Sequence, residues 1–234
     1  MDWTPAPPKP ADFCENQLID AILKNHFPIG SNLPAERDLA GKLGITRPTL
    51  REALQRMACD GWIEIHHGKP TRVRNYWHEG SLAVLSAIAR RSKDLPDDFV
   101  PNLLFVRQLL APTYTYQAID NAPESILAIL KDYPDIEETP EAFTAFDWQL
   151  HHQLTIASRN PVFTLILNGF NELYHHMGCF YFSVERTRQH SRGFYRELQT
   201  ATLAHDASSA HDITHRVMGE SLILWQRVQS IGGM

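Results

Sequence analysis

The stretch Leu33–Thr71 reads LPAERDLAGKLGITRPTLREALQRMACDGWIEIHHGKPT, and its apolar spacing changes from helix-like to strand-like along its length. Leu39 and Leu43 stand four residues apart, as on one face of a helix, and Gly44 follows where a helix can end in a left-handed turn. Thr46 is a good N-cap for a second helix, because its hydroxyl can accept a bond from a first-turn amide. The pattern predicts two short helices joined by a tight turn.

The second of these helices separates its basic residues from its buried stripe. The stripe is predicted to consist of Leu50, Ala53, Leu54 and Met57. Arg47, Thr49 and Arg51 fall outside it, near the helix N-terminus. A recognition helix presents its N-terminal residues to base edges, and Arg can bridge two acceptors of guanine. These three residues are therefore candidates for contact with DNA.

A two-stranded hairpin is predicted after the second helix. Trp62–Ile65 alternates like a half-buried strand, and Thr71–Arg74 is the return strand. The turn carries His67, Gly68 and Lys69, and a narrow basic tip of this kind can enter a minor groove. Two helices and such a hairpin make a winged helix-turn-helix, for which double-stranded DNA is the first partner to consider. A helix-turn-helix that binds only protein is the alternative.

Length and composition bound the rest of the chain. With 234 residues, of which 43% are hydrophobic, two domains with real cores are expected. The cysteines Cys14, Cys59 and Cys179 are widely spaced and form no metal-type pair, which fits reduced thiols in a cytoplasm. Neither a signal peptide nor a membrane span is recognised in the sequence. A cytoplasmic protein without a membrane partner is therefore expected.

The net charge of −5 is unevenly distributed. Residues 36–75 hold eight Lys and Arg against five Asp and Glu, a surplus of three positive charges. Residues 78–234 hold twelve against eighteen, a deficit of six. Contact with nucleic acid is therefore expected from the first part of the chain alone.

Beyond residue 81 the strand signals nearly vanish. Helices are predicted at about 81–91, 96–120, 123–131, 140–157, 161–182, 185–204 and 207–230. The expected organisation is a winged helix-turn-helix domain at 1–77, a linker at 78–84 and an all-α bundle at 85–234. The predicted fold class is thus mainly α, and the interior of such a bundle is a natural ligand cavity.

Two features of the predicted bundle are chemically unusual. Arg107 stands inside the apolar run Leu103–Leu110, where a guanidinium needs an anion from a ligand or from the protein itself. A structural salt bridge is the alternative there. Tyr174 and Tyr181 are seven residues apart on one helical face, which is typical of a core, although a buried phenol needs a hydrogen-bond partner.

One pair of residues bears on both a metal site and an enzyme. Asp147 and His151 are four residues apart, which is ligand spacing on a helix, but twelve histidines produce such pairs by chance. The sequence shows no oriented nucleophile, no phosphate-binding loop and no complete ligand set. We therefore predict no catalytic function, no metal and no cofactor, with a thioesterase-like enzyme that uses this pair as the alternative.

Several segments carry a family resemblance, which runs from about Ile19 to Trp225. These segments are LPAERDLA, GITRPTLREALQRMACDGWIEIHHGKPT, FVRQLL, NPVFTLILNGF, LYHHMGCFYF, GFYREL and GESLILW. The chain resembles the GntR family of bacterial transcription factors and, within it, the fatty-acid-responsive FadR group. The resemblance implies a homodimer that binds a palindromic operator and is released by long-chain acyl-CoA, and that represses or activates genes of fatty-acid degradation and synthesis.

The resemblance also implies roles for individual residues. The implied DNA contacts are Arg37, Thr46, Arg47, Thr49, Arg51, His67, Gly68 and Lys69. The implied ligand contacts are Arg107, Tyr174, Tyr181, Glu220, Ser221 and Trp225. Pro48 replaces an expected hydroxyl residue, and His215 and Met218 replace an expected basic residue and a glycine. These departures leave open the contacts to CoA phosphates and the preferred chain length.

Many relatives with such a bundle bind a divalent metal through an Asp, a His four residues later and two further histidines. Asp147 and His151 match the first two, but Tyr195 and Val217 stand where the others would be. We interpret Asp147 and His151 as a hydrogen-bonded remnant without a metal. A regulator of the same architecture that senses a metal-chelated organic or sugar acid is the alternative.

Overall fold

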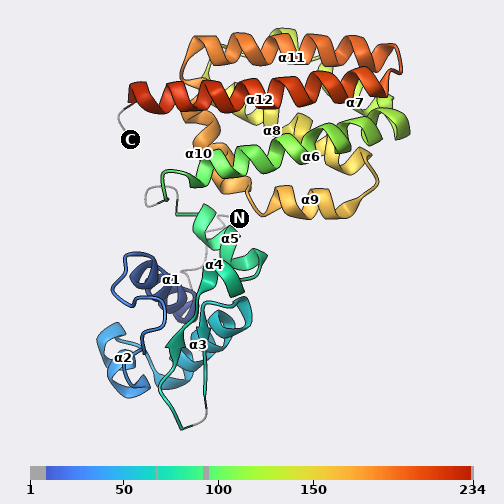
Figure 1. Ribbon diagram of the computed structural model, residues 1–234. Helices are drawn as coiled ribbons and strands as arrows, with labels where there is room; N and C mark the ends of the chain where they lie inside the picture. Colours follow the sequence, from blue (N-terminus) through green and yellow to red (C-terminus); the bar gives the residue numbers. More distant parts are fainter. Residues whose placement is uncertain (1–8, 67, 92–94, 233–234) are drawn as a thin grey trace, which may run out of the picture. The chain divides into compact units, whose positions relative to one another are not determined.

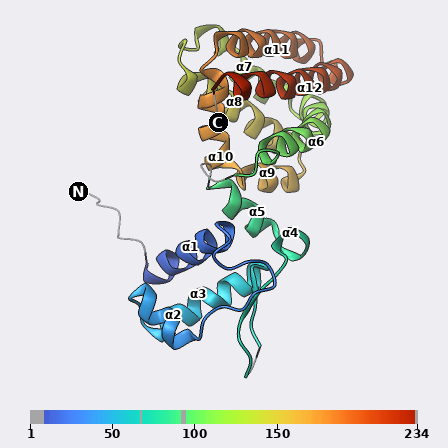
Figure 2. The ribbon, with the colours of Figure 1, turned by 60° about the vertical axis from the view of Figure 1, so that its left-hand side comes forward.

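The computed structural model describes residues 9–66, 68–91 and 95–232, and the chain divides into two compact units (Figures 1 and 2). The first unit is Met1–Ala87 and the second is Ile88–Met234. The predicted linker, residues 78–84, falls on α4 (Tyr76–Glu79) and on the start of α5 (Leu82–Ala89), so this stretch is largely helical.

The first unit is a winged helix-turn-helix, as the sequence predicts. It contains α1 (Pro10–Leu23), α2 (Glu36–Leu43), α3 (Arg47–Asp60), β1 (Ile63–Glu64) and β2 (Arg72–Val73). The two strands are antiparallel, with Ile63 opposite Val73. They are shorter than predicted. β2 also bonds on its other side to residues 30–33, a third extended segment that the sequence analysis missed.

The local signals around the turn of this unit are confirmed. Gly44 has φ +66°, a left-handed conformation that Gly adopts at little cost, and it ends α2. The Thr49 amide donates to Thr46 Oγ1 at 3.3 Å, so Thr46 caps α3. The predicted stripe of α3 is buried, at Leu50, Ala53, Leu54 and Met57. Local chemistry therefore sets where the exposed start of α3 lies.

The second unit is a helical bundle, and its described residues contain no strand. Its helices are α6 (Phe99–Asn121), α7 (Pro123–Leu130), α8 (Pro140–Ala157), α9 (Pro161–Asn168), α10 (Asn171–Phe182), α11 (Glu185–Leu203) and α12 (Ala207–Gly232), with a 3-10 turn at Tyr133–Asp135. Three of these helices begin at a proline, whose missing N–H costs nothing in a first turn. The mainly α fold class is thus confirmed.

One predicted helix is wrong in extent. The segment 161–182 is two helices, because α9 ends at Asn168 and α10 begins at Asn171. Asn and Gly are poor helix formers, and Phe170 at the break turns its side chain into the interior, where only 9% of it is exposed. The break places two short helices, rather than one long one, along the same side of the bundle.

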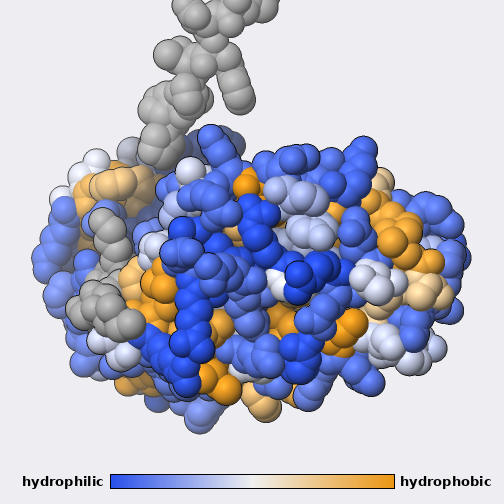
Figure 3. Space-filling model, turned by 90° about the horizontal axis from the view of Figure 1, so that it is seen from above, coloured by the Kyte–Doolittle hydropathy of each residue, from blue (hydrophilic) through white to orange (hydrophobic). Residues whose placement is uncertain are grey.

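The outer face of the bundle is mainly polar. Figure 3 looks onto the side that carries α11, where hydrophilic residues cover most of the surface and hydrophobic ones stand in separate patches. α11 buries Phe194, Tyr195 and Leu198 on its opposite side. Across the described residues, no helix is both long and apolar enough to cross a membrane.

Two pairs of helices approach closely at glycines. In Figure 1, α12 lies along α6, and α10 packs against α8. A Cβ on Gly219 of α12 would lie 2.7 Å from Nε2 of Gln108 in α6. A Cβ on Gly178 of α10 would lie 2.6 Å from Cγ2 of Thr144 in α8. α10 and α8 therefore have little freedom to move closer at Gly178, whereas the flexible end of Gln108 can turn away from Gly219.

Gly178→Ala is expected to lower the free energy of unfolding by about 1–3 kcal/mol, the usual cost of overpacking a core. Thr144 cannot turn away easily, because its hydroxyl donates to the Pro140 carbonyl at 2.7 Å. Gly193→Ala in α11 is the matched control, since its new Cβ would meet nothing within 4 Å. This control should be neutral or stabilising by up to about 1 kcal/mol. Urea unfolding followed by far-UV circular dichroism measures both; equal effects would contradict the close approach.

Candidate functional site

The predicted DNA contacts of the first unit gather around the start of α3. Arg47 is its first residue and is exposed, and Thr46 and Thr49 are joined through their hydroxyl oxygens at 2.8 Å. Arg51 follows one turn later, with its Nε donating to Glu36 Oε2 at 2.8 Å. The structure therefore brings the α3 candidates together on an exposed helix start.

The remaining candidates of this unit lie on α2 and on the hairpin tip. Arg37 is exposed and donates from Nε to the neighbouring Asp38 at 3.2 Å. Gly68 and Lys69 are exposed at the tip, and Gly68 has φ +73°, in the left-handed region. His67 lies outside the described residues. The assignment of these residues to DNA contact stays a prediction.

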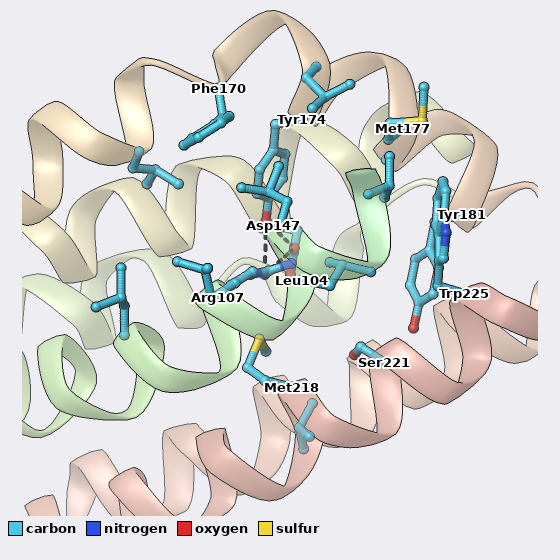
Figure 4. A pocket seen from close by; sticks show the side chains of 18 of the residues that line it. Leu104, Arg107, Asp147, Phe170, Tyr174, Met177, Tyr181, Met218, Ser221 and Trp225 are labelled. Carbon is cyan, nitrogen blue, oxygen red and sulfur yellow. Dashed lines mark hydrogen bonds and ion pairs between the residues drawn. The ribbon is translucent and has the colours of Figure 1, made fainter. Parts of the chain in front are cut away.

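The second unit contains a cavity of about 140 Å³ between its helices. Figure 4 shows part of its lining, and the labelled residues are Leu104, Arg107, Asp147, Phe170, Tyr174, Met177, Tyr181, Met218, Ser221 and Trp225. The walls are mainly apolar side chains from α6, α9, α10 and α12. Its polar groups are few, as is usual for a site that binds a largely apolar small molecule.

A buried ionic cluster forms one side of this cavity. Arg107 Nη2 lies 3.2 Å from Asp147 Oδ2 and 3.0 Å from the Tyr174 hydroxyl oxygen. The Tyr174 hydroxyl donates to the same Asp147 oxygen, and the Tyr195 hydroxyl donates to Asp147 Oδ1 at 2.9 Å. The anion that Arg107 requires is therefore supplied by the protein, so the salt-bridge alternative describes this structure.

Asp147 and His151 are not hydrogen-bonded to each other, contrary to the sequence interpretation. Their nearest atoms, Oδ1 and Nε2, are 4.0 Å apart. His151 Nδ1 pairs instead with the Tyr114 hydroxyl at 2.8 Å, while three other side chains occupy the carboxylate of Asp147. Among the described residues, no three His, Cys, Asp or Glu side chains are grouped as a metal site requires.

Burial governs the ionisation of this cluster. Desolvation and the nearby charge of Arg107 lower the pKa of His151 to about 3, although Asp147 opposes the shift. The imidazole is therefore neutral at pH 7. Burial would raise the pKa of Asp147, but the charge of His151, present only at low pH where its imidazole is protonated, the charge of Arg107 and the hydrogen bonds from Tyr174 and Tyr195 hold it below its usual value. With His151 neutral, Arg107 is the cation that pairs with Asp147 at neutral pH.

The second unit should lose stability as the pH falls below about 6.5, because of His151. Between the unfolded pKa of 6.5 and the folded pKa of about 3, the unfolded chain binds more protons than the folded one. The slope is at most about 1.4 kcal/mol per pH unit. Asp147 affects stability only at lower pH. The stability that its lowered pKa contributes is lost only as the pH falls below the ordinary value of 3.8.

Urea unfolding between about pH 7 and pH 5 tests this slope. His151→Gln should flatten the pH dependence over that range, because Gln can still bond to Tyr114 but does not titrate. His211→Gln is the control, since the His211 side chain is 42% exposed and bonds only to its neighbour Asp212 among the described residues. An unchanged slope in His151→Gln would show that another group is responsible.

Five of the six implied ligand residues line the cavity, and one does not. The five that line it are Arg107, Tyr174, Tyr181, Ser221 and Trp225. Glu220 does not, and its carboxylate is bound by His190 Nε2 at 2.9 Å and by Arg216. Burial raises the pKa of Tyr181 to about 12, so its hydroxyl keeps its proton. Arg107 Nε and Trp225 Nε1 are buried without a hydrogen-bond partner among the described residues, so a ligand could satisfy them.

Sequence reasoning missed three parts of the cavity. Tyr114 was not singled out, although it is seven residues after Arg107 and therefore on the same face of α6. Phe170 was hidden inside a helix that was predicted as continuous. Asp147 was weighed only together with His151 and not as the partner of Arg107, because Arg107 is forty residues away in the sequence and no local pattern connects them.

Comparisons with known proteins cover nearly the whole chain. The profile of the gntR family of bacterial regulatory proteins matches residues 10–73, and that of the FadR C-terminal domain matches residues 74–231. The fatty acid metabolism regulator protein of Shewanella pealeana is 40% identical over 220 residues, which cover 94% of this chain and 92% of that protein. The protein of the same name from Pasteurella multocida is 38% identical over 221 residues, with the same coverage of 94% and 92%.

The fold itself has a counterpart among solved structures. One solved structure has a TM-score of 0.62 to this chain. It is described by the words "Lar controls the expression of the Listeria monocytogenes agr system and mediates virulence". It covers 95% of this chain and 99% of its own length, but only 14% of the residues are identical. This likeness concerns the fold alone.

Proposed function

The chain belongs to the GntR family of bacterial regulatory proteins and carries a FadR C-terminal domain, and from this premise we propose that it regulates the transcription of fatty-acid metabolism genes. In this proposal it binds a palindromic operator as a homodimer, and long-chain acyl-CoA releases it. The relatives named as fatty acid metabolism regulators support the physiological role. The observation that carries the ligand is the apolar cavity with Arg107 and Asp147 on one side.

The residues have distinct roles in this proposal. The proposed DNA contacts are Arg37, Thr46, Arg47, Thr49, Arg51, His67, Gly68 and Lys69. The proposed ligand contacts within the cavity are Arg107, Tyr174, Tyr181, Ser221 and Trp225, and Glu220 is the one proposed ligand contact outside the lining. Apolar helix faces hold the acyl tail. The polar atoms of Arg107 and Trp225 that lack a partner then meet the polar part of the ligand.

The size of the cavity supports release by a shift in population. About 140 Å³ is close to the volume of an engineered protein cavity that holds one benzene molecule. A long acyl tail is much larger, so it must widen the cavity by displacing a wall. α9 is the wall best suited to move, since none of its residues is buried. A ligand that binds the widened arrangement better shifts the equilibrium toward it.

In this proposal, widening of the ligand cavity weakens DNA binding because it changes the geometry of the dimer. A two-fold operator requires two recognition helices about one turn of DNA apart, so a small change in their spacing lowers specific affinity. To make the widened arrangement predominate, the ligand must prefer it by more than the free energy that separates the two arrangements.

Calorimetric titration with long-chain acyl-CoA tests the proposal, with short-chain acyl-CoA and free CoA as controls. We expect binding that requires the long tail, together with release of a DNA duplex that the protein selects from a random pool. Leu104→Trp should fill the cavity and abolish ligand binding. Leu109→Trp is the matched control on the same helix, since Leu109 is 56% exposed and does not line the cavity. No heat with any acyl-CoA would refute the ligand.

A further inference from the structure

An acidic side chain is bound to one of the proposed DNA-contact arginines. Glu36, the first residue of α2, accepts a hydrogen bond from Arg51 Nε at 2.8 Å, across fifteen positions of sequence. The side chains of Arg51 and Glu36 are 63% and 35% exposed, so the pair lies at the surface of the first unit. The pair connects the start of α2 to the first turns of α3.

Stability alone does not account for this arrangement. An exposed ion pair contributes only about 0.2–1 kcal/mol, and an acid at a helix start gains about 0.3–1 kcal/mol from the helix dipole. Asp38 stands in the same first turn and can serve the dipole equally well. A carboxylate close to a DNA-binding surface also repels phosphate and weakens non-specific binding. The position of Glu36 therefore has a cost for DNA affinity.

The geometry of the bond suggests what offsets that cost. A guanidinium has five N–H groups in a rigid fork, and the bond to Glu36 uses the one on Nε. The two terminal nitrogens stay available, and they can bridge O6 and N7 of a guanine. A long Arg side chain otherwise loses rotamer freedom when it binds. Holding Arg51 in advance therefore favours the one orientation that can read a base.

We propose that Glu36 is a positioning residue for sequence discrimination, which holds Arg51 for contact with a base edge. This inference rests on the proposed function, because it requires that the first unit reads operator DNA. Arg47 offers a contrast, since it has no ion-pair partner among the described residues. The bond to Glu36 thus distinguishes Arg51 from Arg47, the other proposed DNA-contact arginine of α3.

The experiment compares specific and non-specific DNA affinity in the full chain. The wild-type protein first selects a duplex from a random double-stranded pool, and fluorescence anisotropy then measures binding to that duplex and to a scrambled one. Glu36→Gln should lower the ratio of the two affinities by about five- to tenfold, at the low end of what one bidentate pair contributes. Affinity for the scrambled duplex should stay the same or rise, because a negative charge is removed.

Glu52→Gln is the matched control for charge. Glu52 is exposed on α3 beside Arg51, yet no bond joins it to a proposed DNA contact among the described residues. This variant should leave the affinity ratio unchanged. In an Arg51→Ala background, Glu36→Gln should lower the ratio no further, because the residue to be positioned is gone.

Each outcome decides the matter. Three results would overturn the role of Glu36. They are a wild-type affinity ratio in Glu36→Gln, a reduction of the ratio in Glu52→Gln as large as in Glu36→Gln, and a further reduction when Glu36→Gln is added to Arg51→Ala. A loss of thermal stability in Glu36→Gln that matches its loss of binding would make the pair structural and also overturn it. If the wild-type protein enriches no sequence, operator binding fails and the inference fails with it.

Discussion

Arg47→Ala is expected to lower the affinity for the selected operator duplex by about 2–6 kcal/mol. One bidentate contact between Arg and guanine is worth about 1–3 kcal/mol, and a two-fold site contains two of them. Arg47 is suited to such a contact because it is the first residue of α3, exposed, and oriented by the cap that Thr46 provides. Fluorescence anisotropy with selected and scrambled duplexes measures the loss.

Arg47→Lys separates base reading from simple attraction to phosphate. Lys keeps the charge but lacks the planar fork, so it should restore affinity for the scrambled duplex and little of the discrimination. Calorimetry should show unchanged binding of acyl-CoA in both variants. Retained sequence-specific binding by Arg47→Ala would contradict the assignment of α3 as the recognition helix.

Asp147→Ala is expected to destabilise the second unit by about 3–5 kcal/mol, the usual effect of removing one partner of a buried ion pair. Arg107 would keep its charge in a largely buried site without its carboxylate partner. Urea unfolding followed by far-UV circular dichroism measures the loss. Asp212→Ala is the control, because Asp212 is exposed and its removal should change stability by less than about 0.5 kcal/mol.

Arg107→Leu should cost less than Asp147→Ala, since Asp147 would retain the donated hydrogen bonds of Tyr174 and Tyr195. A folded Arg107→Leu protein then allows the ligand response to be measured directly. We expect weaker binding of acyl-CoA and unchanged affinity for DNA without ligand. If Arg107→Leu is the more destabilised of the two, Arg107 serves mainly to hold the fold.

In the first unit, features that depend on neighbouring residues were predictable from the sequence, and features that depend on distant residues were not. The cap at Thr46, the left-handed Gly44 and the buried stripe of α3 were predictable, because each depends on residues within a turn or two. The strand pairing was less predictable, since residues 30–33, which bond to β2, carry no strand-like alternation of their own. The bond between Glu36 and Arg51 left no signal at all.

The second unit shows the same division. The prolines that begin α7, α8 and α9 marked helix starts, and five of the six implied ligand residues line the cavity. The break at Phe170 was missed, because the apolar pattern continues across it and the weak helix propensity of Asn168 and Gly169 does not by itself end a helix.

The sequence by itself therefore determined the two folds, most of the helix starts and the residues that carry unusual chemistry, because hydrophobic periodicity and caps act over a few neighbouring residues. Only the tertiary structure decided the partners. It paired Arg107 with Asp147 and Arg51 with Glu36, and it kept His151 neutral and separate from Asp147. Such pairings follow from which helices pack together and from how much water is excluded between them, and neither is written in local spacing.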